Sequence, residues 1–100
     1  MAKVIIMYRH PTDKERFDDH YFGTHTALAS KVPHVKCFSV HQVAKTNKKE
    51  LDLYLISEIE FESAEECEAV LNTAEWKAVE QDASNLALFL AEPPLVIRTR

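Results

Sequence analysis

Residues 2–9 alternate in a way that predicts a strand buried on both sides. Apolar side chains occupy the even and the odd positions alike: Val4, Ile6 and Tyr8 against Ile5 and Met7. A strand that is apolar on both faces belongs in the middle of a sheet that is covered on both sides. Any fold for this chain must therefore place something apolar against each face of that sheet.

The remaining pattern predicts the order strand, helix, strand, strand, helices, strand. After residues 2–9 come a helix over 13–32, strands over 35–46 and 51–61, helical segments over 63–72 and 73–82, an ambiguous stretch over 83–91 and a strand over 95–99. Thr12 with Glu15, and Ser63 with Glu66, have the spacing of capping boxes. The polar turn at 47–50 makes a hairpin of the middle strands. This order is the α+β, ferredoxin-like βαββαβ arrangement with an antiparallel sheet.

All the predicted helices fall on one side of that sheet. The other sheet face is also apolar, and large exposed apolar surfaces mark interaction sites. A second copy of the chain is the most economical cover, because a two-fold axis lets one surface serve both partners. The sequence therefore predicts a homodimer joined through its sheet faces, which closes a dimeric α/β barrel.

Length and charge restrict the class of protein further. One hundred residues make a single domain, 1–100, and the net charge of −4 argues against nucleic acid as a partner. No apolar run is long enough to span a bilayer, and residues 1–7 are too short for a signal peptide. Cys37 and Cys67 form no framework, so we interpret them as reduced thiols of a cytoplasmic protein.

The helix over 13–32 carries an unusual buried stripe. At helical spacing it presents Phe17, Tyr21, Thr24, Leu28 and Val32, with His25 at one edge and His20 at the other. A core helix normally offers aliphatic residues there. This helix instead turns a phenol, a hydroxyl and an imidazole towards the sheet that it covers.

His25 and Tyr21 are the main candidates for chemistry. A histidine at neutral pH serves as general base or acid, but a helix histidine can equally do no more than bond a carbonyl. Tyr21 can donate to a substrate carbonyl or enolate, although a buried tyrosine more often packs its ring and tethers its hydroxyl. Both alternatives stay open from the residues alone.

Five further residues are candidates for ligand contact. Phe17 and Thr24 share the helix stripe, Tyr8 and His10 share a face of the first strand, and His41 lies on a neighbouring strand. If Tyr8 faces the helix, then Tyr8 and His10 can line one pocket with Tyr21 and His25. If it does not, Tyr8 and His10 lie in the dimer interface.

No metal or cofactor is expected. His20 and His25 are five positions apart, so on an α-helix they diverge by about 140°. No cysteine and histidine cluster and no glycine-rich phosphate loop occurs. Gly23 is the only glycine, and its place inside a helix suggests close approach of another backbone or a ligand, or plain packing.

Several of these residues resemble the pattern of the EthD family, named for ethyl tert-butyl ether degradation. The resemblance rests on Met7-Tyr8-Arg9 followed by Pro11, on Phe17-Asp18, on Tyr21-Phe22-Gly23-Thr24-His25 with Leu28, and on Pro33, Trp76 and Asp82. Ala27 stands where members often have proline. The resemblance implies the dimeric α/β-barrel fold and a role in breakdown of small organic compounds.

Two classes of function follow from the residues and the resemblance together. The first is an enzyme without cofactor, of oxygenase, cyclase or lyase type, acting on a small apolar or carbonyl-bearing metabolite. In it His25 moves a proton while Tyr21, with or without Tyr8, orients the oxyanion. The second is a non-catalytic accessory protein that binds such a metabolite within a degradation pathway. A solvent-reachable His25 favours the enzyme, and a sealed His25 that is hydrogen-bonded only to protein favours the binder or a purely structural role.

Overall fold

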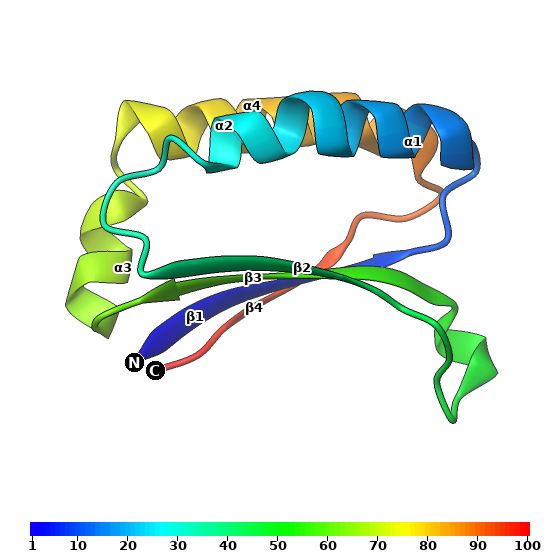
Figure 1. Cartoon of the computed structure of the whole chain (residues 1–100), viewed down its shortest axis with the longest axis horizontal. Coiled ribbons are helices and arrows are strands. Elements are labelled where there is room, and N and C mark those ends of the chain that lie inside the picture. The colour runs from blue at the N-terminus through cyan, green and yellow to red at the C-terminus, as the bar shows by residue number, and fades with distance from the viewer.

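A computed structural model describes all residues 1–100 and confirms the ferredoxin-like α+β fold. Its single antiparallel sheet has the strand order β2-β3-β1-β4 (Figure 1). The strands are β1 (Ala2–Arg9), β2 (Cys37–Gln42), β3 (Leu53–Phe61) and β4 (Leu95–Arg98). β1 is therefore central, as its two apolar faces predict.

Except for the short helix at Lys49–Leu51 in the β2–β3 connection, the helices cover one face of the sheet or close its end. Figure 1 shows α1, α2 and α4 as one layer above the strands, while α3 closes the end near both termini. Their bounds are α1 (Lys14–His20), η1 (Tyr21–His25), α2 (Thr26–Ala29), η2 (Lys49–Leu51), α3 (Ala64–Val70), α4 (Ala74–Leu86) and η3 (Ala87–Phe89). None of these helices has the length and apolar character needed to cross a membrane.

The even-numbered residues of β1 face the helices. Val4 and Tyr8 are buried there, and the strand register places Leu55 and Ile59 of β3 on the same side. The odd-numbered face, with Ile5 and Met7, points away from every helix and stays half-exposed. Its neighbours across the sheet are Ile56 and Glu58 on β3, Leu95 and Ile97 on β4, and Ser39 and His41 on β2.

A β-bulge changes the faces at the start of β3. The pairing shifts between Tyr8 and Arg9, so that Arg9 pairs with Leu53 and Tyr54 has no partner on β1. Simple alternation puts Tyr54 on the face away from the helices, which is wrong. The extra residue turns Tyr54 towards α1, where its hydroxyl donates to the carboxylate of Asp18 at 2.6 and 2.8 Å.

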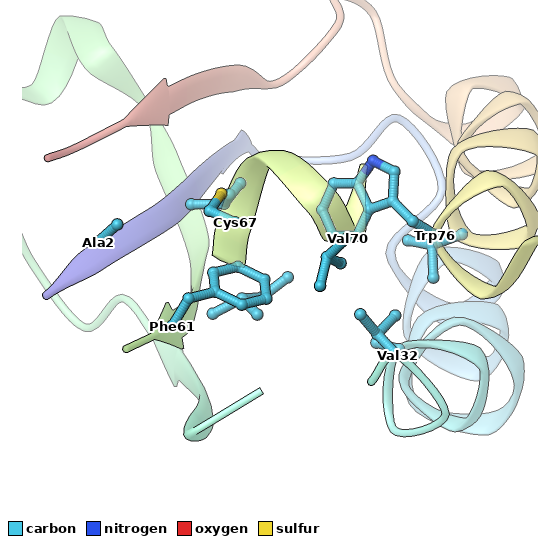
Figure 2. Packing of buried hydrophobic residues seen from close by; sticks show 10 residues of the cluster. Ala2, Val32, Phe61, Cys67, Val70 and Trp76 are labelled. Atoms are coloured by element: carbon cyan, nitrogen blue, oxygen red, sulfur yellow. The ribbon is translucent and has the colours of Figure 1, made fainter. Parts of the chain in front are cut away.

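Buried side chains form two clusters between the sheet and the helices. One holds Trp76, Phe61 and Val70, and Figure 2 shows Trp76 of α4 and Val32, which follows α2, pointing into it. The other is aromatic and gathers Tyr8, Phe17, Tyr21 and Tyr54 with Leu55 and Leu86. Rings in the second cluster meet edge-on or stacked at 5.4 to 5.9 Å between centroids, which suits their quadrupoles.

The predicted first helix is interrupted by a π-helical turn, η1. The backbone amide of Thr26 donates to the carbonyl of Tyr21, five residues earlier. The widened turn moves the buried stripe to Phe17, Tyr21, His25, Ala29 and Val32. Thr24, which the α-helical spacing places in the stripe, is therefore exposed, and His25 is buried in its stead.

Two local expectations about this first helix are also corrected. Its N-cap is Asp13 rather than Thr12, because the Asp13 side chain accepts from the Arg16 amide. Gly23 is exposed, and a Cβ at that position meets nothing within 4 Å, so no backbone approaches closely there. Ser63, by contrast, caps α3 as predicted, by accepting from the Glu66 amide.

Candidate functional site

The carboxylate of Asp82, on α4, binds two histidines, His20 at the end of α1 and His25 at the end of η1. His25 lies with Nδ1 2.9 Å from Oδ2 of Asp82. His20 lies with Nε2 2.8 Å from Oδ1 and 3.0 Å from Oδ2. The side-chain amide of Asn85 donates to Oδ1 at 3.0 Å. Donors thus surround the carboxylate, which is buried together with His25.

The π-helical turn is what brings the two histidines to one carboxylate. Five residues separate them, and on a regular α-helix their side chains point about 140° apart. Because η1 closes a wider ring, both imidazoles instead reach Asp82. The predicted divergence of His20 and His25 is therefore wrong. The prediction assumed a regular α-helix, and no feature of the sequence marks the π-helical turn.

The surroundings of Asp82 keep it ionised. Burial alone disfavours the charged carboxylate, but hydrogen bonds from Asn85, His25 and His20 outweigh that effect and lower the pKa of Asp82 below its usual 3.8. An ionised carboxylate only accepts hydrogen bonds, so each histidine must turn an N–H towards it. His25 is thereby held with its proton on Nδ1 and, when neutral, with a lone pair on Nε2.

A cavity of about 270 Å³ lies beside His25 on the helix side of the sheet. Its walls are mostly apolar, with Ile6, Trp76, Val79 and Val96 among them, and Tyr8 and His25 supply polar groups. Nε2 of His25 has no hydrogen-bond partner within the protein. Every side-chain nitrogen or oxygen that is fully shielded from solvent does have such a partner, so Nε2 is not fully shielded. Nε2 is therefore reached from this cavity.

Tyr8 and Tyr21 stay protonated beside the histidine. Burial raises the pKa of the Tyr8 hydroxyl, and the neighbouring Tyr21 and Asp82 raise it further. Burial also raises the pKa of Tyr21, against a smaller opposing effect of the Ser57 hydroxyl. Tyr8 lines the cavity and has no hydrogen-bond partner in the protein, so its hydroxyl is available as a donor to a ligand.

The structure brings together three of the seven candidate site residues. Tyr8 and His25 line the cavity. The Tyr21 ring packs against both of their rings, with its centroid 5.6 Å from that of Tyr8 and 5.4 Å from that of His25. Phe17 is fully buried in the aromatic cluster and does not line the cavity. Thr24 points to solvent.

The other two candidates lie away from the cavity. His10 is exposed at the end of β1, where its Nδ1 lies 2.7 Å from Oδ1 of Asp52. Its ring centroid lies 5.2 Å from that of Tyr54. His41 lies on the sheet face without helices, with Nε2 3.2 Å from Glu58. Neither histidine reaches the ligand space beside His25.

Sequence reasoning missed the residues that hold His25 in place. The sequence indicates Asp82 only through the family resemblance, places His20 at the edge of the helix stripe and gives no indication of Asn85. An acidic residue at helical spacing from the apolar Trp76 and Val79 is the signal that can reveal Asp82, because that spacing places its carboxylate on the buried face of the helix. No comparable signal exists for His20, because its position depends on the π-helical turn.

Comparison with known proteins now assigns the family. The EthD domain matches residues 9–89, which include α1, η1, α2, β2, β3 and Asp82 on α4. The chain belongs to the EthD family. The matched residues include His25 and Asp82, which are hydrogen-bonded to each other in the structure.

One solved structure agrees with this assignment, and two further proteins are similar in sequence or in fold. An EthD family protein from Bacillus halodurans C-125 has 30% sequence identity and a TM-score of 0.88, covering 100% of this chain and 97% of its own. An uncharacterised 11.0 kDa protein from the thcB–thcC intergenic region of Rhodococcus erythropolis is 30% identical over 87 residues, 87% of this chain and 84% of its own. HapK from Hahella chejuensis, at 18% identity, shares the fold with a TM-score of 0.67 over 100% and 91% of the chains.

Proposed function

We propose that this EthD protein transfers a proton to and from a small carbonyl compound, with His25 as general base and without a cofactor. The observation that carries the proposal is the different surroundings of the two ring nitrogens of His25. Asp82 binds Nδ1 at 2.9 Å, and Nε2 is free at an apolar cavity. A base oriented by a carboxylate and open to a ligand on its other nitrogen is equipped for this task.

The proposed step is removal of a proton from the carbon next to a carbonyl. The C–H bond breaks, the proton goes to Nε2 of His25, and the electron pair moves onto the carbonyl oxygen to form an enolate. The Tyr8 hydroxyl donates to that oxygen, and its raised pKa keeps it a donor. Asp82 stabilises the imidazolium that forms, and return of the proton to carbon completes the cycle.

The cavity restricts the substrate to a compact, uncharged molecule. Its walls include Ile6, Val79 and Val96, and no lysine or arginine lines it to bind a carboxylate or phosphate. Polar contacts come from His25 and Tyr8 at one part of the wall, with Glu80 also on the lining. We therefore expect cyclic or aryl ketones and related enols to bind, with the carbonyl towards Tyr8.

Deuterium exchange tests this function without knowledge of the natural substrate. In heavy water, the protein should incorporate deuterium next to the carbonyl of small ketones such as acetophenone, cyclohexanone and 1-indanone. His25→Gln should lower the exchange rate by about 100- to 10,000-fold, the usual share of a general base. Asp19→Asn, an exposed substitution on α1, is the matched control and should leave the rate unchanged.

Ligand binding separates the enzyme from a binder. If the ketones bind and no exchange above the buffer rate occurs, the protein is a non-catalytic accessory protein of a degradation pathway, and the proposed catalysis is refuted. If they neither bind nor exchange, the proposed substrate class is refuted as well.

We further propose that the chain acts as a homodimer through the sheet face opposite the helices. Solved structures with this fold include proteins described as dimeric from Bacteroides fragilis and Thermobifida fusca. In this chain that face presents Ile5, Met7 and Ile56 around Lys3 and Glu58, which form an ion pair at 3.4 Å. Apolar side chains that flank one internally paired charge leave a self-complementary patch for a two-fold interface.

A further inference from the structure

We propose that His20 is a positioning residue for proton transfer by His25, acting through the shared carboxylate of Asp82. The inference rests on the proposed function. It gives a role in that function to His20, which does not line the cavity and contacts no substrate there. The π-helical turn η1 serves this arrangement, because it is the feature that lets His20 and His25 reach one carboxylate.

The two oxygens of Asp82 have different partners. Oδ2 faces His25 at 2.9 Å and also His20 at 3.0 Å. Oδ1 faces His20 at 2.8 Å and the Asn85 amide at 3.0 Å. His20 is thus the one donor that spans both oxygens. It fixes the rotation of the carboxylate about its last side-chain bond, and so the direction in which Oδ2 presents itself to His25.

Without His20, the Asp82 carboxylate keeps only one hydrogen-bond partner besides His25. That partner is Asn85, three residues away on the same helix, so this bond does not hold the carboxylate relative to any element outside α4. His20 belongs to α1, and its bond joins the two helices on the solvent side of the site, where its side chain is 26% exposed. Loss of this bond should let Asp82 turn away, so that the proton on Nδ1 of His25 is no longer fixed.

A merely stabilising bridge between α1 and α4 is the competing interpretation. It predicts that substitutions of His20 change the melting temperature but leave the protonation pattern of His25 and its chemistry intact. The two interpretations therefore differ in the tautomer of His25, which nitrogen-15 NMR reports directly.

The test uses two variants of His20 in the full-length protein. His20→Gln keeps an N–H donor at similar reach, and His20→Phe keeps a planar ring but removes the donor. Spectra recorded at about pH 8, where an ordinary histidine is neutral, reveal which nitrogen of each ring carries the proton. Thermal melts of both variants and of Asp19→Asn provide the folding control.

We expect the wild type and His20→Gln to hold His25 in the single form protonated on Nδ1. His20→Phe should give a mixture of forms and lower the ketone exchange rate by about 10- to 100-fold, the cost of misplacing a catalytic group. Rescue by His20→Gln shows that the N–H, not the imidazole itself, does the positioning. If both variants lose exchange equally, the N–H role is refuted.

Each outcome separates this inference from the proposed function. If His25→Gln abolishes exchange while His20→Phe retains it and the single form of His25, the positioning role is refuted and the catalytic role stands. If the wild type exchanges no ketone, the proposed function fails, while the tautomer spectra still decide whether His20 positions Asp82. If His20→Phe does not fold, a mixed His25 tautomer in His20→Ala supports the inference, and a single form refutes it.

Discussion

Nδ1 of His25 lies 2.9 Å from Oδ2 of Asp82, across 57 positions of sequence. This hydrogen bond sets which nitrogen of His25 faces the ligand space. It also joins η1 to α4, the two helical elements that flank the cavity. The pair therefore links the fold to the proposed chemistry, and changes at Asp82 should affect both.

Asp82→Asn should remove the proposed activity while the chain still folds. An amide presents its NH₂ group as well as its oxygen, so it no longer requires the proton of His25 to sit on Nδ1. By analogy with a carboxylate–histidine pair in other enzymes, we expect a loss of roughly 1,000- to 10,000-fold in the rate of ketone exchange. Exchange retained within about tenfold of the wild type would rule out the orienting role of Asp82.

The same carboxylate should make the protein sensitive to acid. Because the folded pKa of Asp82 lies below its usual 3.8, its contribution to stability is complete above the unfolded pKa. That contribution is lost as the pH falls from about 4 through the folded pKa. Urea unfolding of wild type and Asp82→Asn at several pH values measures this, and the two curves should converge in acid. A constant difference between them down to about pH 2 would contradict the lowered pKa.

The fold was largely predictable from the sequence, and the candidate site only in part. Alternation, capping residues and the short turn between β2 and β3 specify the topology, because each acts over a few residues. His25 stood out because an imidazole beside an apolar stripe is unusual. Asp82 and His20 could not be placed near it, since their meeting depends on the π-helical turn and on the packing of α4 against η1.

The bulge in β3 shows the same limit on a smaller scale. Alternation assigns Tyr54 to the open face, and one unpaired residue reverses that assignment. The sequence of β3 carries no glycine to mark the bulge. Tertiary packing of the Tyr54 ring in the aromatic cluster, with its hydroxyl on Asp18, accounts for the choice.

Ionisation of the tyrosines should be suppressed up to unusually high pH. Burial raises the pKa of Tyr8, Tyr21 and Tyr54, the three tyrosines of the chain, above the ordinary 10.0. Since the unfolded chain ionises first, stability should fall as the pH rises above about 10. Absorbance near 295 nm should show little tyrosinate at that pH until the protein unfolds. Half-ionisation of the native protein at about pH 10 would contradict the burial of these hydroxyls.

Gly23→Ala should stabilise the protein. Nothing lies within 4 Å of a Cβ at this position, and the backbone there does not need a positive φ. Alanine loses less conformational freedom on entering a helix, which is worth about 0.5–1 kcal/mol. Ala27→Gly, an exposed substitution one turn later, is the matched control and should destabilise by a similar amount. Destabilisation by Gly23→Ala would mean that the π-helical turn itself requires glycine.

Phe17→Ala should cost about 3–5 kcal/mol of unfolding free energy. The ring is fully buried in the aromatic cluster and contacts Tyr8, Tyr21 and Tyr54. Phe22→Ala, whose residue is 43% exposed, is the control and should cost far less. Urea unfolding measures both. A small effect of Phe17→Ala would show that the cluster repacks around the lost ring.

Ile5→Asp should convert the proposed homodimer into monomers. Ile5 lies on the central strand, on the face without helices, so a dimer through that face would bury the new carboxylate without a partner. We expect the wild type to bury at least about 1,200 Å² in total, the lower end for specific interfaces. Leu88→Asp is the control, since Leu88 lies in η3 and is 76% exposed. Light scattering over a dilution series should give a dimeric mass for the wild type and for Leu88→Asp, and a monomeric mass for Ile5→Asp. A wild type that is a well-folded monomer at micromolar concentration, or an Ile5→Asp variant that remains a dimer, would exclude the sheet face as the interface.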